Sequence, residues 1–193
     1  MDSHDLGQGH IRTLDLLGQV GVRPVRGVIT GGAGFLGSHL VDALMEAGWR
    51  VSVIDNLSSG SVANVSRWFG NPSFSFYKED LKDTQGSWAK TFSEADAIFH
   101  MAANPEVRVS SIKPRVHFDE NVVATFNVLE AIRKHDVEVL VFASSSAVYG
   151  EGGDKPVTEE APKKPVSVYG ASKLACEILI ETYCKLYGLK ALI

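Results

Sequence analysis

The chain has 193 residues, 45% of them hydrophobic and 22% charged, which is enough for one globular domain with a sizeable core. The net charge of −4 gives no electrostatic reason to expect nucleic acid or an anionic membrane as a partner. No apolar run approaches the length of a membrane span, and the N-terminus is acidic rather than signal-like. We therefore expect a cytoplasmic protein.

The cysteine and histidine positions carry no sign of cross-links or metal. Cys176 and Cys184 fall eight positions apart on one expected helix, about 12 Å of rise, which is too far for a disulfide. The six histidines are scattered without the spacing of metal ligands. Free thiols and no metal are the expectation.

Residues 1–25 have no clear pattern, because four glycines interrupt them, and we expect a flexible N-terminal extension. From residue 26 to residue 193, strand and helix signals alternate, which is typical of parallel βαβ units. Strands are expected at 28–30, 51–54, 74–78, 97–100, 139–143 and from 190 onward, and helices from the 31–37 turn to Gly48, at 119–135 and at 167–187. The predicted fold is α/β, a doubly wound and mostly parallel sheet of the Rossmann type, with an exposed loop over 150–165.

The first strand leads into a glycine-rich turn, Gly31-Gly32-Ala33-Gly34-Phe35-Leu36-Gly37. Glycines at 31, 32 and 34 allow a tight turn and close approach of a phosphate, and Gly37 lets the following helix lie against the strand. In that helix Leu36, Leu40, Ala43, Leu44 and Ala47 are expected on one apolar face. This strand, turn and helix predict a dinucleotide-binding unit.

Asp55 stands at the end of the second strand, about 20 residues after the turn. A carboxylate there can accept both ribose hydroxyls of the adenosine half of a dinucleotide. It would repel a 2′-phosphate, so the sequence predicts NAD rather than NADP as cofactor.

Tyr169 and Lys173 are four positions apart on an expected helix, so both side chains project from one face. A cation one turn away stabilises the phenolate and makes the tyrosine a usable base near neutral pH. Ser145, at the end of the preceding strand, can hydrogen-bond the substrate oxygen that the tyrosine deprotonates. These three residues are the predicted catalytic group.

Several of these motifs, taken in order, resemble those of the extended short-chain dehydrogenase/reductases, in the branch of NAD-dependent nucleotide-sugar epimerases. The matching segments are 30–37, 55–58, 80–81, 100–103, Asn121, 144–150 and 169–173. The resemblance covers 28–193, and within the branch the 102–108 segment most resembles UDP-glucose 4-epimerases.

The resemblance implies a set of binding residues in addition to the catalytic group. For the cofactor these are Gly31, Gly34, Phe35, Leu36, Gly37, Asp55, Asn56, Ser58, Ser59, Gly60, Asp80, Leu81, Ala102, Ala103, Asn121, Tyr169 and Lys173. For the substrate they are Ser145, Ser146 and Tyr169. The two long helices, 119–135 and 167–187, resemble the pair that forms a homodimer interface in the family.

The family resemblance also narrows the reaction. Dehydratases of this kind carry an Asp-Glu pair, and decarboxylases a glutamate, where this chain has Ser146 and Ala147. Oxidation of a sugar and its re-reduction then remain, which is epimerisation at carbon 4 of UDP-glucose or UDP-galactose through a 4-keto intermediate. Family members also have a C-terminal domain that holds the nucleotide of the sugar, and most of it is missing from this chain. Two alternatives follow: an NAD-binding fragment without turnover, or an epimerase of another nucleotide sugar such as UDP-glucuronate.

Overall fold

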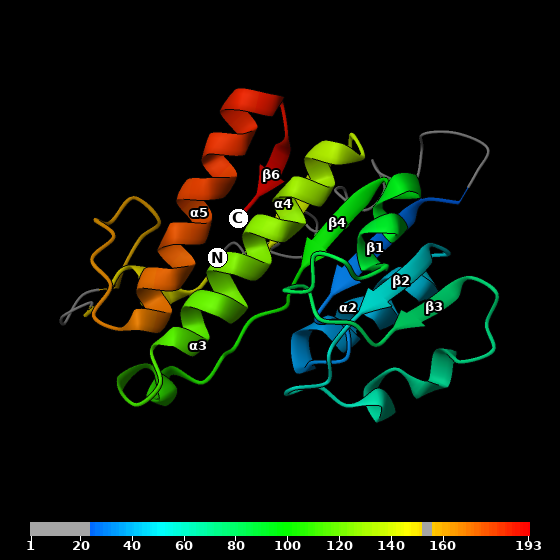
Figure 1. Cartoon of the computed structure of the whole chain (residues 1–193), viewed down its shortest axis with the longest axis horizontal. Coiled ribbons are helices and arrows are strands. Elements are labelled where there is room, and N and C mark those ends of the chain that lie inside the picture. Colours follow the sequence, from blue (N-terminus) through cyan, green and yellow to red (C-terminus); the bar gives the residue numbers. More distant parts are fainter. Residues whose placement is uncertain (1–23, 152–155) are drawn as a thin grey trace, which may run out of the picture.

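A computed structural model describes residues 24–151 and 156–193 (Figure 1). The predicted N-terminal extension lies outside the described residues, apart from its last two positions. Six strands form one sheet in the order β3-β2-β1-β4-β5-β6, and every neighbouring pair is parallel. Their bounds are β1 Arg26–Thr30, β2 Arg50–Ile54, β3 Phe74–Tyr77, β4 Ala97–His100, β5 Val139–Phe142 and β6 Lys190–Leu192. The predicted doubly wound parallel sheet is confirmed.

The strand order reverses beside β1. Thr30 at the end of β1 is in register with Ile54 of β2 on one side and with His100 of β4 on the other. From β1 the chain passes to β2 on one side, and it later returns to β4 on the other side. The segments that follow β1 and β4 therefore run in opposite directions away from the boundary between the two strands. In open α/β sheets such a switch point is where ligands bind.

Helices cover the two faces of the sheet. The helices α4, Ala124–Lys134, and α5, Val168–Tyr187, lie side by side over one face, and α2, Phe35–Glu46, lies on the other (Figure 1). Alternate residues of one strand therefore enter different cores: Val28 packs with the α4 and α5 side chains, whereas Ile29 packs with those of α2. Both of these strand residues are at most 2% exposed.

The buried face of α2 differs from the predicted one. Its buried residues are Gly37, Ser38, Val41, Leu44 and Met45. Of the predicted apolar face, Leu44 is buried and Leu40 is partly buried, whereas Leu36, Ala43 and Ala47 are exposed. The close contact of Gly37 with the turn fixes the rotation of the helix, and this constraint outweighs the apolar pattern.

The helix expected at 119–135 has an unexpected start. A short helix α3, Arg115–His117, runs into a π-helix, η5, Phe118–Val123, before α4 begins. π-helices are rare and often occur at functional sites. Here the π-helix places Asn121 in the interior, only 1% exposed, against α5.

The last helix has the ends expected from its sequence. Ser167 is the N-cap, and its hydroxyl accepts a hydrogen bond from the amide of Gly170 at 3.0 Å. Gly188 ends α5 with φ +74°, a left-handed conformation that favours glycine. The described part of the 150–165 loop is irregular and mostly exposed, as predicted. No helix in the described part of the chain is both long and apolar enough to cross a membrane.

Candidate functional site

A cavity of about 430 Å³ opens at the carboxyl ends of the central strands. Most of the predicted cofactor residues line it: Gly31, Gly34, Phe35, Leu36, Gly37, Asp55, Asn56, Ser58, Ser59, Asp80, Leu81, Ala102, Ala103, Tyr169 and Lys173. These residues come from five separate segments of the chain. The fold therefore brings the predicted motifs into one site.

The glycine turn lies directly against the segment that follows β4. Gly31 has φ +70°, and a Cβ atom built there would lie 2.6 Å from the amide nitrogen of Ala102. A Cβ at Gly37 would lie 2.2 Å from the carbonyl oxygen of Gly31. Distances below 3 Å require the backbone to move, so any larger residue at these two positions would displace the turn.

The N-terminus of α2 is open toward the cavity. Its N-cap, Gly34, has no side chain to accept from the free amides, and the first residues of the helix line the cavity. Uncapped helix amides together with the helix dipole favour an anion such as a phosphate. Apart from its chain neighbours, a Cβ at Gly34 would meet only the Gly31 carbonyl oxygen, at 3.2 Å, so the space beside this residue is otherwise open.

Asp55 is held in place by two backbone amides. Its Oδ2 accepts from Ala33 at 2.9 Å and its Oδ1 accepts from Leu57 at 2.7 Å. The residue is 8% exposed and lines the cavity. Each carboxylate oxygen can accept more than one hydrogen bond, so capacity remains for a ligand. Because Ala33 belongs to the glycine turn, this contact also ties the turn to the end of β2.

Lys173 and Tyr169 line the same cavity from α5. The Lys173 ammonium donates to the carbonyl oxygen of Ala143 at 2.7 Å and lies 4.7 Å from the centre of the Phe142 ring. Burial lowers the pKa of Lys173 to about 8, and the carboxylate of Glu177 opposes part of that shift. A cation held in a buried position beside a tyrosine is a suitable environment for proton transfer.

The backbone of Tyr169 is held from η5 by a chain of hydrogen bonds. Asn121 donates through its Nδ2 to the Ser172 hydroxyl at 2.8 Å, and that hydroxyl donates to the carbonyl oxygen of Tyr169 at 2.7 Å. The Asn121 Oδ1 accepts from the amide of Asn104 at 2.8 Å. Asn121, one of the predicted cofactor residues, does not line the cavity; its contacts join the segments that do.

Three further predicted residues also lie outside the lining of the cavity. Gly60 packs on the backbone of Ala33, where a Cβ would approach within 2.8 Å. Ser145 is the N-cap of a short 3-10 helix and its hydroxyl accepts from the amide of Ala147 at 3.2 Å, whereas Ser146 is exposed. Their predicted roles stay predictions.

Ser144, rather than its two neighbours, lines the cavity among the three consecutive serines. Its hydroxyl donates to Glu177, a carboxylate that is only 4% exposed. Glu177 also accepts from the ammonium of Lys163, 2.5 Å away, on the 150–165 loop. The sequence reasoning missed Glu177, although its position one helical turn after Lys173 was a usable signal.

Two buried histidines differ sharply in their surroundings. His100 bonds Thr30 at 2.6 Å and Thr125 at 2.9 Å through its two ring nitrogens. Burial, together with the charge of Lys173, lowers the pKa of His100 to about 3, so the ring is neutral. His117 is fully buried, and neither of its ring nitrogens has a hydrogen-bond partner among the described residues. Its ring packs nearly perpendicular to that of Tyr169, with the centroids 5.6 Å apart.

Other lining residues were also missed by the sequence reasoning. They are Ile54, Glu79, Lys82, Met101, Pro105, Glu120, Ala124 and Ala143. Several directly follow a strand or lie next to a predicted site residue, which is a positional signal. The residue types alone do not distinguish these positions from other residues at strand ends, loops or helix starts.

The NAD dependent epimerase/dehydratase family model matches residues 28–193. The chain belongs to this family. It is 42% identical over 164 residues to a putative UDP-glucose 4-epimerase of Methanocaldococcus jannaschii, an alignment that covers 84% of the chain and 52% of that protein. The chain spans about half the length of the curated relatives it matches.

Solved structures of family members have the same fold. A crystal structure of a UDP-galactose 4-epimerase has 54% identity and a TM-score of 0.78, over 86% of the chain and 54% of that protein. The Thermus thermophilus UDP-glucose 4-epimerase in complex with NAD has 40% identity and a TM-score of 0.79, over 86% of the chain and 53% of that protein. The similarity therefore extends over only about half of each of these longer proteins.

The contrast between the histidines gives a stability prediction. Replacing His117 with Phe removes two buried, unpaired nitrogens, and we expect the free energy of unfolding to rise by about 1–3 kcal/mol. His100→Phe is the matched control: it removes both threonine hydrogen bonds, and we expect a loss of similar or larger size. Urea unfolding at pH 7 measures both values, and a destabilised His117→Phe protein would contradict this account.

The burial of Lys173 gives a pH prediction. Its pKa is lowered to about 8 in the folded chain from 10.5, so between these values the unfolded chain binds more protons. Folding stability should therefore rise with pH from about 8 to about 10.5, by up to about 3 kcal/mol. Lys173→Met should lack this rise. The free energy of unfolding of the parent minus that of the variant, measured by urea unfolding, should therefore increase across this pH range. A parallel pH dependence of the two proteins would refute it.

Proposed function

We propose that the chain binds NAD in the cavity and carries the catalytic half of an epimerase acting at carbon 4 of UDP-glucose or UDP-galactose. One observation carries the proposal: a single cavity is lined both by an open helix N-terminus with an aspartate and by a tyrosine with a buried lysine. The first pair suits a dinucleotide and the second suits proton transfer to a sugar hydroxyl.

The residues fit NAD at each end of the cavity. The amides at the start of α2 would hold the pyrophosphate, because Gly34 leaves them uncovered. Asp55 would accept from the adenosine ribose, since its two oxygens are already fixed by backbone amides. Asp80 and Leu81 would contact the adenine, with Asn56, Ser58 and Ser59 beside them and Ala102 and Ala103 along the cavity. Gly60 and Asn121 would support these segments from behind.

The proposed catalytic residues act at the sugar's 4-hydroxyl. Tyr169 removes its proton and later returns a proton to the same oxygen, and Lys173 stabilises the phenolate. Ser145, and Ser146 beside it, would hydrogen-bond that oxygen. NAD, when bound, supplies the oxidation of carbon 4 and the reduction of the resulting ketone. The fixed backbone carbonyl of Tyr169 and the packing of His117 on its ring would hold the tyrosine in place.

A second function is NAD binding without turnover. It is favoured because Ser145 and Ser146, the predicted substrate residues other than Tyr169, do not line the cavity. Incubating the chain with NAD and UDP-galactose and following UDP-glucose formation separates the two. Formation of UDP-glucose supports the epimerase, and NAD binding without product supports the binding module. UDP-glucuronate in parallel tests the choice of sugar.

A homodimer is part of the proposal. Large apolar side chains are exposed on the outer side of the η5–α4 and α5 helices, and Figure 1 shows those helices uncovered. They are Phe118, Phe126, Ile178, Leu186 and Tyr187. Large exposed apolar side chains that gather on one face often mark an association surface. We also propose a cytoplasmic location, which suits the two unpaired cysteines.

Cofactor choice is the first prediction of this proposal. The fixed carboxylate of Asp55 would repel the 2′-phosphate of NADP, so calorimetry should find NAD bound at least about tenfold more tightly. Asp55→Ala should narrow that ratio by removing the charge. NADP binding equal to or tighter than NAD would contradict the assignment.

The second prediction concerns the tyrosine. Tyr169→Phe keeps the ring and removes the hydroxyl, so turnover should fall by about two to four orders of magnitude. NAD affinity should stay within about twofold, because the α2 amides and Asp55 carry most of it. Lys173→Ala should weaken both turnover and NAD binding, whereas Ser145→Ala should affect turnover less. Epimerisation at the parent rate by Tyr169→Phe would disprove the mechanism.

The third prediction concerns association. Sedimentation velocity at micromolar concentration should show a dimer, and Phe126→Glu with Ile178→Glu should convert it to a monomer by placing charges in the contact. Ser66→Glu is the matched control and should leave the dimer intact. Ser66 is exposed, and its neighbour Arg67 forms ion pairs with Asp42 and Glu46 of α2, the helix on the other face of the sheet. A parent protein that sediments as a monomer would exclude this association surface.

A further inference from the structure

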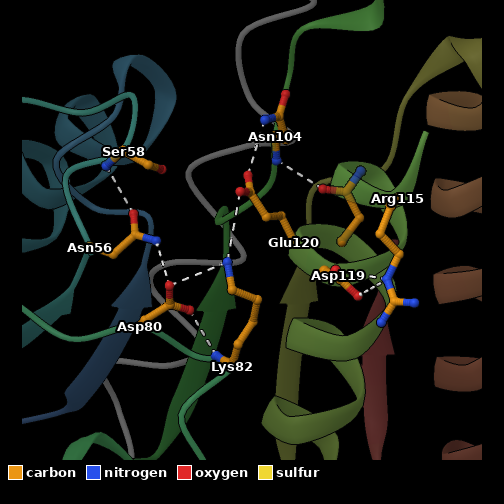
Figure 2. Close-up of polar contacts among 9 residues, drawn as sticks. Asn56, Ser58, Asp80, Lys82, Asn104, Arg115, Asp119 and Glu120 are labelled. Carbon is orange, nitrogen blue, oxygen red and sulfur yellow. Dashed lines mark hydrogen bonds and ion pairs between the residues drawn. The ribbon is translucent and has the colours of Figure 1, made fainter. Parts of the chain in front are cut away.

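Ion pairs of Lys82 join two segments that line the candidate cofactor cavity, the segment after β3 and the π-helix η5. Lys82, in the segment after β3, places its ammonium 3.3 Å from Asp80 Oδ2 and 3.7 Å from Glu120 Oε1 (Figure 2). Asp80 and Lys82 belong to the β3 side of the cavity, whereas Glu120 belongs to η5 on the other side. All three residues line the cavity.

The pair closes a continuous line of polar contacts. On the β3 side, Asn56 donates to Asp80 Oδ2 at 3.1 Å. On the η5 side, the Asn104 side chain donates through Nδ2 to Glu120 Oε2 at 3.0 Å. The backbone N–H of Asn104 donates to Asn121 Oδ1 at 2.8 Å. Figure 2 shows Asn56, Asp80, Lys82, Glu120 and Asn104 linked one after another by these contacts. From Asn121 the line continues through Ser172 to the backbone of Tyr169.

We propose that Lys82 and Glu120 form a strap across the cavity that slows release of the bound dinucleotide. The proposal rests on the proposed function, because it takes the ligand of this cavity to be NAD. The strap residues are positioning residues: they hold the two walls together around the cofactor. Through Asn104 and Asn121 they also connect the adenosine half of the site to the helix that carries Tyr169.

The charges of these residues support the proposal that Lys82 and Glu120 hold the two sides of the cavity together. Asp80 and Glu120 are carboxylates on opposite walls, and the Lys82 ammonium between them replaces their repulsion with attraction. The Lys82 and Glu120 side chains are 33% and 27% exposed, so they are screened less than a fully exposed pair. An ion pair beside them serves as a comparison: Arg115 and Asp119 bond at 2.8 Å, but Arg115 is 80% exposed and neither residue lines the cavity.

The test is a double-mutant cycle read out by cofactor release. Lys82→Met keeps most of the aliphatic stem and removes the charge, and Glu120→Gln keeps an oxygen that can accept from Asn104. Bound NADH is displaced by excess NAD in a stopped-flow fluorimeter, using the 193-residue chain. Arg115→Met is the control variant. Hydrogen exchange of residues 80–83 and 118–121 in the cofactor-free chain gives a second readout that needs no cofactor.

We expect each strap variant to release NADH about twofold to fivefold faster than the parent, in keeping with a partly exposed ion pair. The double variant should be no faster than the faster single variant, because one pair is broken in all three. Exchange should accelerate at both segments, and Arg115→Met should match the parent in both readouts.

Parent-like release and exchange in the strap variants would overturn the proposal while leaving the cofactor site intact. Slower release from the variants would also overturn it, because the pair would then obstruct the cofactor rather than retain it. A parent chain that binds neither NAD nor NADH would instead refute the proposed function, and the strap with it.

Discussion

Gly31 and Gly37 bring the turn after β1, the start of α2 and the segment after β4 within van der Waals distance of one another. That close approach depends on the absence of two Cβ atoms, and it determines where the N-terminus of α2 lies. The Asp55 carboxylate then ties the turn to the end of β2 through the amide of Ala33. Because the cavity is bounded by these same segments, its shape follows from this packing.

The other end of the cavity depends on α5 and η5. The helix α5 brings Lys173 into a buried position where its charge is destabilised, and the carbonyl oxygen of Ala143 compensates part of that cost. The π-helix turns Asn121 inward, so that it holds Ser172 and, through it, the backbone of Tyr169. His117 adds a buried polar ring without hydrogen-bond partners in the described part of the chain. The buried charge of Lys173 and the unpaired ring of His117 lower stability locally, whereas the hydrogen bonds through Ser172 hold the backbone of Tyr169 in position.

The parallel sheet and most of the cavity could be predicted from the sequence, because strands, glycines and helix caps are set by local chemistry. The buried face of α2 could not, since Ala43 and Ala47 fit the apolar pattern while the backbone contact of Gly37 determines the rotation. The π-helix was also beyond reach, because its extra residue has no compositional signal. Contacts such as Lys82 with Glu120 join residues far apart in the sequence, and only the folded chain reveals them.

The central claim is that the α2 N-terminus and Asp55 hold a dinucleotide. A titration of the ¹⁵N-labelled chain with NAD, followed by amide NMR, tests it most directly. The account predicts saturable shifts that are largest at the amides of residues 34–37 and 55–58, and their loss at 34–37 in a Gly34→Val protein, whose added side chain would meet the Gly31 carbonyl oxygen. Saturable shifts confined to other parts of the chain, or no shifts at millimolar NAD, would contradict it.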